Sequence, residues 1–184
     1  MNSLITPSCP GFRSDNLIII LINYYKANLA DLHLFANFEI MTNSNRIRFF
    51  FQHPGVTLRE KNRLKIFIQR IFQREKRSLD GLNYIFCSDK ELLGINQEFL
   101  GHDFFTDIVT FELSEIPGKI QGEIYISIDR VKENAKNLGV SFKSELHRVI
   151  FHGALHLCGY GDKTKGEKEE MRIKEDQYLA SYFK

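Results

Sequence analysis

The chain has 184 residues, of which 43% are hydrophobic and 26% are charged, and its net charge is +2. This size and apolar content suit one globular domain with a buried core, and so small a net charge does not by itself indicate a nucleic-acid-binding protein. The three cysteines, Cys9, Cys87 and Cys158, are odd in number and lack paired spacing, which argues against a disulfide-rich secreted protein and favours the reducing cytoplasm.

The first 45 residues differ in character from the rest. The apolar run at residues 17–22 is far shorter than the ~20 residues that a membrane-spanning helix needs, and it lacks the basic start and cleavage site of a signal peptide. We therefore expect no membrane association. We expect residues 1–45 to be a poorly ordered extension, or Met41 to be the true start. A genuine extra strand or helix is the alternative. Residues 46–184 are expected to form the functional domain.

From Arg46 onward, the sequence alternates short apolar segments with amphipathic ones. Runs rich in β-branched and aromatic residues, bounded by turn residues, predict strands at residues 47–51, 82–86, 107–113 and 122–128. Helices are predicted from a capping box of Thr57 and Glu60, over residues 90–99, from residue 129 to Gly139, from a cap at Ser141, and from a second capping box of Thr164 and Glu167. This order predicts an α+β fold, with a small mixed four-stranded sheet packed by helices.

The first of these helices has an apolar side and a basic side. Its inner face is expected to consist of Leu64, Phe67, Ile68, Ile71 and Phe72. Residues 59–77 hold eight Lys or Arg against two Glu, a local net charge of +6, so the remainder of the chain sums to −4. A charged helix face is often only solvated, and a contact with a phosphate backbone is the other interpretation. The candidate residues for such a contact are Arg63, Arg70, Arg74 and Arg77.

The segment from His152 to Asp162 is the most informative part of the chain. His152 and His156 stand four residues apart at the end of a run that begins near Phe142, in which apolar residues recur at helical intervals. On a helix, this spacing places both imidazoles on one side, one turn apart. Gly159 is expected to stop the helix, and Asp162 follows closely enough to fold back as a third ligand. Two imidazoles, a carboxylate and one open position are typical of a catalytic zinc site.

Other interpretations of this segment remain. A single histidine on an apolar helix is more often a hydrogen-bonded core residue than a ligand, and Cys158 is expected to pack as a small hydrophobic residue rather than to bind the ion. The best-known motif of this geometry, H-E-x-x-H, carries the general base of zinc peptidases. In this chain the position of that Glu is Gly153. The predicted metal site therefore lacks the peptidase base.

The same segment resembles the H-G-x-L-H-L-x-G-Y signature of the YbeY family, bacterial metal-dependent endoribonucleases that help mature ribosomal RNA. Segments 95–103, 106–111 and 122–127 are also similar to this family, so that the resemblance covers roughly residues 46–182. It implies a zinc-dependent endoribonuclease that cuts single-stranded RNA in the maturation of the small-subunit rRNA 3′ end and in ribosome quality control. One Zn²⁺ ion would be held by His152, His156 and Asp162, on a helix packed against the sheet in a zincin-like arrangement. The implied partners are RNA, the ribosomal small subunit and ribosome-assembly proteins.

Two positions depart from the family pattern. Asp162 stands where most of the family has His, although a carboxylate can still bind zinc. Leu100 stands where the family commonly has an Arg thought to serve activity, so a nearby cation, His102 or one from the basic helix, would have to replace it. The group that takes the proton is left open between Asp103, Asp107 and the nucleic acid itself.

Two other classes of function compete with this one. A metallopeptidase-like hydrolase is disfavoured by Gly153 at the position of the base. A ribosome-associated binding module with a structural zinc is disfavoured because closed structural sites use four protein ligands, usually rich in Cys.

Overall fold

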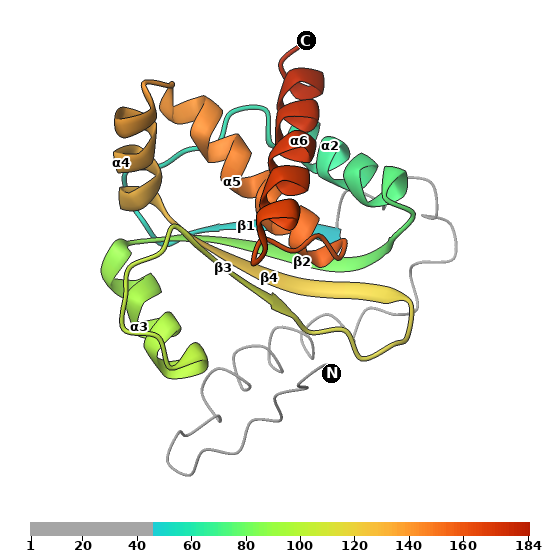
Figure 1. Cartoon of the computed structure of the whole chain (residues 1–184), viewed down its shortest axis with the longest axis horizontal. Coiled ribbons are helices and arrows are strands. Elements are labelled where there is room, and N and C mark those ends of the chain that lie inside the picture. The colour runs from blue at the N-terminus through green and yellow to red at the C-terminus, as the bar shows by residue number, and fades with distance from the viewer. Residues whose placement is uncertain (1–45) are drawn as a thin grey trace, which may run out of the picture. The chain divides into compact units, whose positions relative to one another are not determined.

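A computed structural model of the protein describes residues 46–184 (Figure 1). The extension expected at residues 1–45 lies outside this part of the chain. The helices and strands are, in order, β1 (Ile47–Phe51), α2 (Lys61–Arg74), β2 (Ser78–Cys87), α3 (Asp89–Leu100), β3 (Ile108–Glu112), β4 (Lys119–Ser127), α4 (Ile128–Leu138), α5 (Phe142–Leu157) and α6 (Lys165–Tyr182). No helix within residues 46–184 is long and apolar enough to cross a membrane.

The strands form one mixed sheet in the order β1-β2-β4-β3. β1 and β4 both pair with β2 in parallel, and β3 pairs with β4 antiparallel and forms an edge. The predicted mixed four-stranded sheet is therefore confirmed. β2 begins at Ser78 rather than at residue 82, because the pair Asp80-Gly81, which suggests a turn in the sequence, is accommodated by a register shift within the strand.

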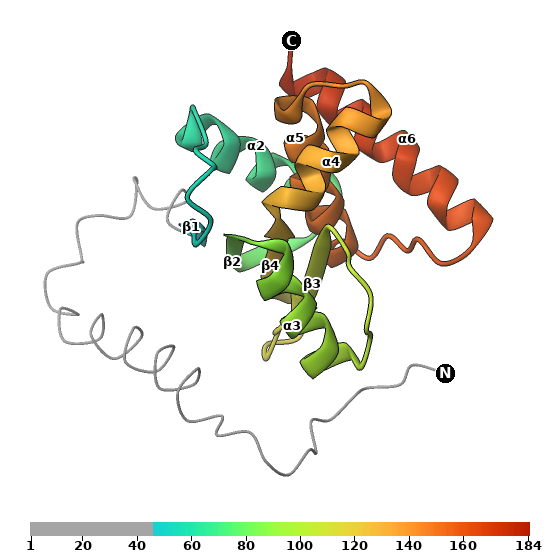
Figure 2. The ribbon, with the colours of Figure 1, turned by 90° about the vertical axis from the view of Figure 1, so that its left-hand side faces the viewer.

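Helices cover both faces of the sheet. α2, α4, α5 and α6 lie on one side and α3 on the other, as the two perpendicular views show (Figures 1 and 2). The larger core lies on the four-helix side, and a smaller cluster of Cys87, Leu92 and Val109 lies beneath α3. The buried hydroxyl of Tyr84 on β2 donates to the carbonyl of Ile150 at 3.1 Å and fixes α5 on the sheet.

The start of α2 differs from the prediction. Glu60 adopts a left-handed conformation (φ 53°), and no side chain caps the helix. The carboxylate of Glu60 instead accepts from Arg63 at 3.2 Å. Val56 and Leu58 are buried just before the helix, so core packing fixes the path of the chain into it. The predicted capping box of Thr57 and Glu60 is wrong. The predicted inner face of the helix is confirmed, because all five of its apolar residues are buried.

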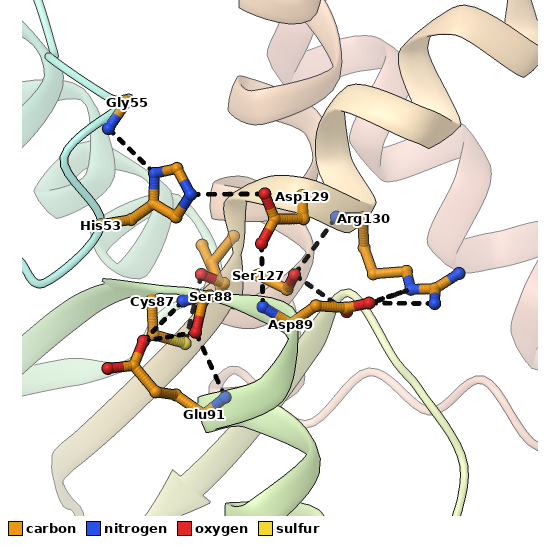
Figure 3. A network of polar contacts seen from close by, with 10 residues as sticks. His53, Gly55, Cys87, Ser88, Asp89, Glu91, Ser127, Asp129 and Arg130 are labelled. Atoms are coloured by element: carbon orange, nitrogen blue, oxygen red, sulfur yellow. Dashed lines mark hydrogen bonds and ion pairs between the residues drawn. The ribbon is translucent and has the colours of Figure 1, made fainter.

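A polar network holds the first turns of α3 and α4 together (Figure 3). His53 Nε2 lies 3.3 Å from a carboxylate oxygen of Asp129. The other oxygen of Asp129 accepts from the backbone N–H of Asp89 at 3.1 Å. The carboxylate of Asp89 accepts from the Ser127 hydroxyl at 3.1 Å and from Arg130 Nε at 3.0 Å. This network anchors the start of α3, whose other end leads into the loop beside the candidate site.

Candidate metal centre

α5 carries both histidines and is shaped by local sequence signals. The Ser141 side chain accepts from the backbone N–H of Ser144 and caps the first turn, as predicted. The helix ends at Leu157, and Gly159 follows with φ 101°, a conformation that favours glycine. The backbone N–H groups of Gly159 and Tyr160 bind carbonyls of the last turn. The chain thereby reverses direction and returns Asp162 toward the helix.

The three predicted ligands come together. The Nε2 atoms of His152 and His156 lie 2.9 Å apart, and Asp162 Oδ2 lies 4.0 Å from the first and 3.7 Å from the second. The three candidate ligand atoms lie within 4.8 Å of one another. Among the His, Cys, Asp and Glu side chains of residues 46–184, these three form the group that could hold a metal ion. All three side chains are partly exposed, so that a solvent ligand can reach an ion between them.

Hydrogen bonds orient both imidazoles. His152 Nδ1 lies 2.7 Å from Glu175 Oε1, and His156 Nδ1 lies 2.9 Å from the carbonyl oxygen of Tyr160. A carbonyl and an ionised carboxylate can only accept, so each Nδ1 carries the hydrogen and donates it. Neutral imidazoles then present two unprotonated Nε2 atoms to each other. Two facing lone pairs repel unless a cation lies between them, and a divalent metal ion fits this donor set.

The electrostatic surroundings of His156 favour its neutral form. Burial, followed by the neighbouring His152, lowers the pKa of His156, although the Tyr160 carbonyl and Asp162 act in the opposite direction. A lowered pKa keeps this ring unprotonated, which is the form that coordinates metals.

Glu175 on α6 is a residue of the site that the sequence analysis missed. Its second oxygen accepts from Arg148 at 2.9 Å. Burial alone would raise the pKa of Glu175, but the hydrogen bonds from His152 and Arg148 outweigh burial and lower it. A carboxylate that binds the far nitrogen of a metal-ligating histidine is a common outer partner. The sequence does contain one indication that Glu175 points inward. It lies on the same helical stripe as Met171 and Tyr178, which are buried.

Two further residues of types that can bind metals, His147 and Cys158, do not belong to the group of His152, His156 and Asp162. His147 is buried, donates to the carbonyl of Lys143 at 2.6 Å and stacks on Tyr182, as a core histidine does. Cys158 is buried in the main core, and burial raises its pKa to about 12, so it remains a neutral thiol. It packs as a small hydrophobic residue, as expected.

A cavity of about 690 Å³ adjoins the three ligands and runs past the edge strand β3. Leu100, His102 and Asp107 line it. Of the two residues considered as proton acceptors, Asp107 lines this cavity, and its carboxylate accepts from Asn134 at 3.0 Å. Asp103 is exposed and accepts from Gln97 instead. Of the cations considered as replacements for the family arginine, His102 lies in this cavity.

The four basic candidates fall into two pairs. Arg63 donates to the carbonyl of Tyr182 at 2.6 Å, and Arg77 donates to the carbonyl of Cys158 at 2.9 Å. These two side chains thus support the fold. Arg70 and Arg74 are exposed on α2. The residues that line the cavity beside the metal ligands include none of the four.

Gly153 stands where a zinc peptidase has its base, and the structure gives a reason for glycine. A Cβ atom there would lie 2.9 Å from Ile108 Cδ1 and from both Cδ1 and Cγ2 of Ile124. α5 therefore approaches the sheet so closely at this point that a side chain here would require the two isoleucine side chains to move.

Comparison with known proteins identifies relatives of this chain. A family model described as Endoribonuclease YbeY matches residues 53–183. The chain is 52% identical to the endoribonuclease YbeY of Cytophaga hutchinsonii over 73% of its own length and 94% of that protein. It is 45% identical to that of Flavobacterium psychrophilum, over 68% of this chain and 89% of that protein. A solution structure from Thermotoga maritima aligns with 29% identity and a TM-score of 0.49, covering 74% of this chain and 89% of that one.

Proposed function

The chain belongs to the YbeY endoribonuclease family, and from this premise we propose that it hydrolyses single-stranded RNA at a metal ion held by His152, His156 and Asp162. The observation that carries the proposal is the pair of Nε2 atoms 2.9 Å apart, each on a ring whose Nδ1 is already engaged. Two imidazoles with a carboxylate form the donor set of a catalytic zinc site, and Zn²⁺ is the ion that we propose.

When bound by these three residues, the proposed metal would act as a Lewis acid on a phosphoryl oxygen and would lower the pKa of a bound water. Other groups of the chain orient the ligands and accept the proton. Glu175 and the Tyr160 carbonyl hold the two rings with Nε2 directed at the ion. Asp107, which lines the same cavity, is our candidate for the group that takes the proton from the attacking water. Lys163 brings positive charge to the cavity wall, and the ring of His102 offers a hydrogen-bond donor for a phosphate.

The biological substrate that we propose follows from the family. The names of the relatives specify an endoribonuclease, and we propose that this chain matures the 3′ end of small-subunit rRNA and takes part in ribosome quality control. Contact with the ribosomal small subunit and with assembly proteins belongs to the same proposal. We further propose that α5 and the mixed sheet correspond to a zincin-like arrangement, in which the helix carries two ligands but no glutamate base.

The two competing classes are less well supported. A metallopeptidase of the H-E-x-x-H type needs a glutamate base at position 153, where this chain has Gly153 packed against Ile108 and Ile124. A structural zinc needs a fourth protein ligand, whereas the group of candidate ligands within residues 46–184 contains three.

The test is cleavage of a single-stranded oligoribonucleotide by purified protein that has been stripped with chelator and then titrated with Zn²⁺, Mn²⁺ or Mg²⁺. We expect cleavage that depends on metal, spares the same sequence in a duplex, and is lost in Asp162→Ala. Absence of cleavage with every ion would refute the proposal. Equal cleavage by Asp162→Ala would trace the activity to a contaminating nuclease or to a different site.

A further inference from the structure

An aromatic pair stands in the cavity that adjoins the metal ligands. His102 and Phe104 stack with ring centroids 5.1 Å apart and an interplanar angle of 23°, and both line the cavity that also contains His152 and His156. Phe104 is 58% exposed. An exposed, stacked aromatic pair beside a catalytic site is a feature that core packing does not account for.

The backbone of the loop that carries this pair is held on both sides. The buried Asn96 side chain donates to the carbonyl of Phe104 at 2.8 Å, and the backbone N–H of His102 donates to the carbonyl of Asn96 at 3.2 Å. Gly101 caps α3 with φ 66° and turns the chain into the loop. At the other end, the backbone N–H of Ser127 donates to the carbonyl of Asp107 at 2.9 Å. The aromatic surface is thus ordered before any ligand arrives, which lowers the entropic cost of binding.

The other side chains of the same cavity favour a polar ligand. His102, Asp107 and Lys163 line it together with Phe104. An apolar segment of a protein partner would leave these polar groups without hydrogen bonds, whereas a nucleotide offers both a π-face and hydrogen-bonding groups.

We infer that His102 and Phe104 form a stacking subsite for one unpaired nucleobase of the RNA, next to the phosphodiester that is cut. This inference rests on the proposed endoribonuclease function and specifies how the site would select single strands. A base can lie on the aromatic pair only when it is free of its own helical stack, so a duplex is excluded. Stacking on an aromatic side chain accepts any base, because every base has a π-face.

Phe105 provides a matched control for Phe104. It is the next residue, it is 50% exposed, and its ring lies under the guanidinium of Arg130 at 4.6 Å rather than among the residues that line the cavity. Both phenylalanines can be truncated without opening the core.

The experiment measures kcat and KM of the metal-loaded enzyme on a single-stranded oligoribonucleotide for wild type, Phe104→Ala, Phe104→Tyr and Phe105→Ala. Loss of one base–aromatic stack weakens binding about fivefold or more, so KM of Phe104→Ala should rise by at least that factor, with kcat within about twofold of wild type. Phe104→Tyr should restore KM, and Phe105→Ala should match wild type. Zinc content and melting temperature of Phe104→Ala should equal those of wild type, because this ring touches neither the ligands nor the core.

Substrates with a single abasic position locate the base. With wild-type enzyme, removing the base at one position near the cut should raise KM as much as Phe104→Ala raises it on intact RNA. Phe104→Ala acting on that abasic substrate should show no further increase in KM. Additive effects at every position, or a Phe104→Ala enzyme equal to Phe105→Ala, would overturn the subsite while leaving the proposed function intact. Failure of wild type to cut RNA at all would instead overturn the proposed function.

Discussion

Each imidazole of the candidate site is oriented by an acceptor from a different part of the chain. His152 relies on Glu175, which is 23 residues away on α6, and His156 relies on the carbonyl of Tyr160 in the turn that follows its own helix. Asp162 has fewer constraints, because its side chain is 47% exposed and reaches the site from a short turn. The proposed ligand that departs from the common family pattern is therefore also the one that a substitution can test with least disturbance to the core.

Replacing Asp162 tests the ligand assignment. Loss of an outer partner of a metal ligand lowers metal affinity about 10–100-fold. Asp162→Ala should lower zinc affinity by more than this, because it removes a direct ligand. Asp162→His should retain zinc and activity, because imidazole suits zinc well. Zinc content after dialysis and RNA cleavage are the measurements. Full occupancy in Asp162→Ala would refute the assignment, and loss of zinc with unchanged cleavage would make the metal structural.

Replacing Glu175 tests the role of the outer partner. Glu175→Gln removes the negative charge that holds the Nδ1 hydrogen of His152, and zinc affinity should fall about 10–100-fold. Asp176→Asn is the control, because Asp176 also pairs with Arg148, at 2.7 Å, but is 58% exposed. Competition with a chromophoric chelator measures both variants. Equal affinities for the two variants would show that Glu175 stabilises the fold without tuning the site.

At the scale of secondary-structure elements, local signals were sufficient for most of the fold. The predicted caps at Ser141 and Thr164 and the stop at Gly139 are all present, because each depends on a few neighbouring residues. The Thr57–Glu60 box failed because burial of Val56 and Leu58 overrides the local preference. The proximity of His152, His156 and Asp162 followed from helical spacing and a glycine stop, and their metal binding stays a prediction. Glu175 was missed because its contact joins two helices, and a single sequence does not reveal which helices meet.

The close approach of α5 to the sheet can be tested with two glycines. Gly153→Ala places a Cβ atom 2.9 Å from Ile108 and Ile124, so overpacking should destabilise the protein by about 1–3 kcal/mol. Gly94→Ala, in α3, meets no atom within 4 Å and should stabilise by about 0.5–1 kcal/mol, because alanine favours a helix. Urea unfolding of both variants measures the difference. Equal stability of Gly153→Ala and wild type would mean that the two isoleucines move aside.

The basic side of α2 can be tested by charge reversal. Arg70 and Arg74, both exposed, are replaced together by Glu. This change should weaken RNA binding, and the slope of log K against log salt should become shallower by about 0.7 for each phosphate that is no longer neutralised. Lys132→Glu with Lys136→Glu on α4 changes the net charge equally and serves as the control. Fluorescence anisotropy at several salt concentrations supplies both quantities. If the two double variants behave alike, the basic face contributes only to net charge or solvation.

At the scale of the whole described domain, segments far apart in the sequence hold the turn that carries Asp162. The Tyr160 hydroxyl donates to Glu75 at 2.7 Å, Lys174 pairs with the same carboxylate at 2.9 Å, and the Tyr178 hydroxyl also binds it. Burial would raise the pKa of Glu75, but these hydrogen bonds and Lys174 outweigh it and lower the pKa. The end of α2 and the middle of α6 thus fix Tyr160, whose carbonyl orients His156. The site is a product of the complete domain rather than of the histidine helix alone.

The contacts of Arg46 and Ile47 limit how far the chain can be shortened from its N-terminus. Within the described residues the core begins at Ile47, which is 1% exposed, and Arg46 donates to the carbonyl of Leu79 at 2.8 Å. A chain that starts at Met41 keeps both contacts, and we expect it to melt within about 2 °C of the full chain.

A chain that starts at Pro54 is the matched control for this truncation. It loses β1, which pairs with β2 from Ile47 to Phe51, and it also loses His53, which binds Asp129. The parallel edge of the sheet and its buried isoleucine then disappear together, so we expect a large loss of melting temperature or no folded protein. Thermal unfolding followed by circular dichroism compares the three chains. A fall of several degrees for the chain that starts at Met41 would show that residues 1–40 pack on the domain, and that the boundary drawn from the sequence is wrong.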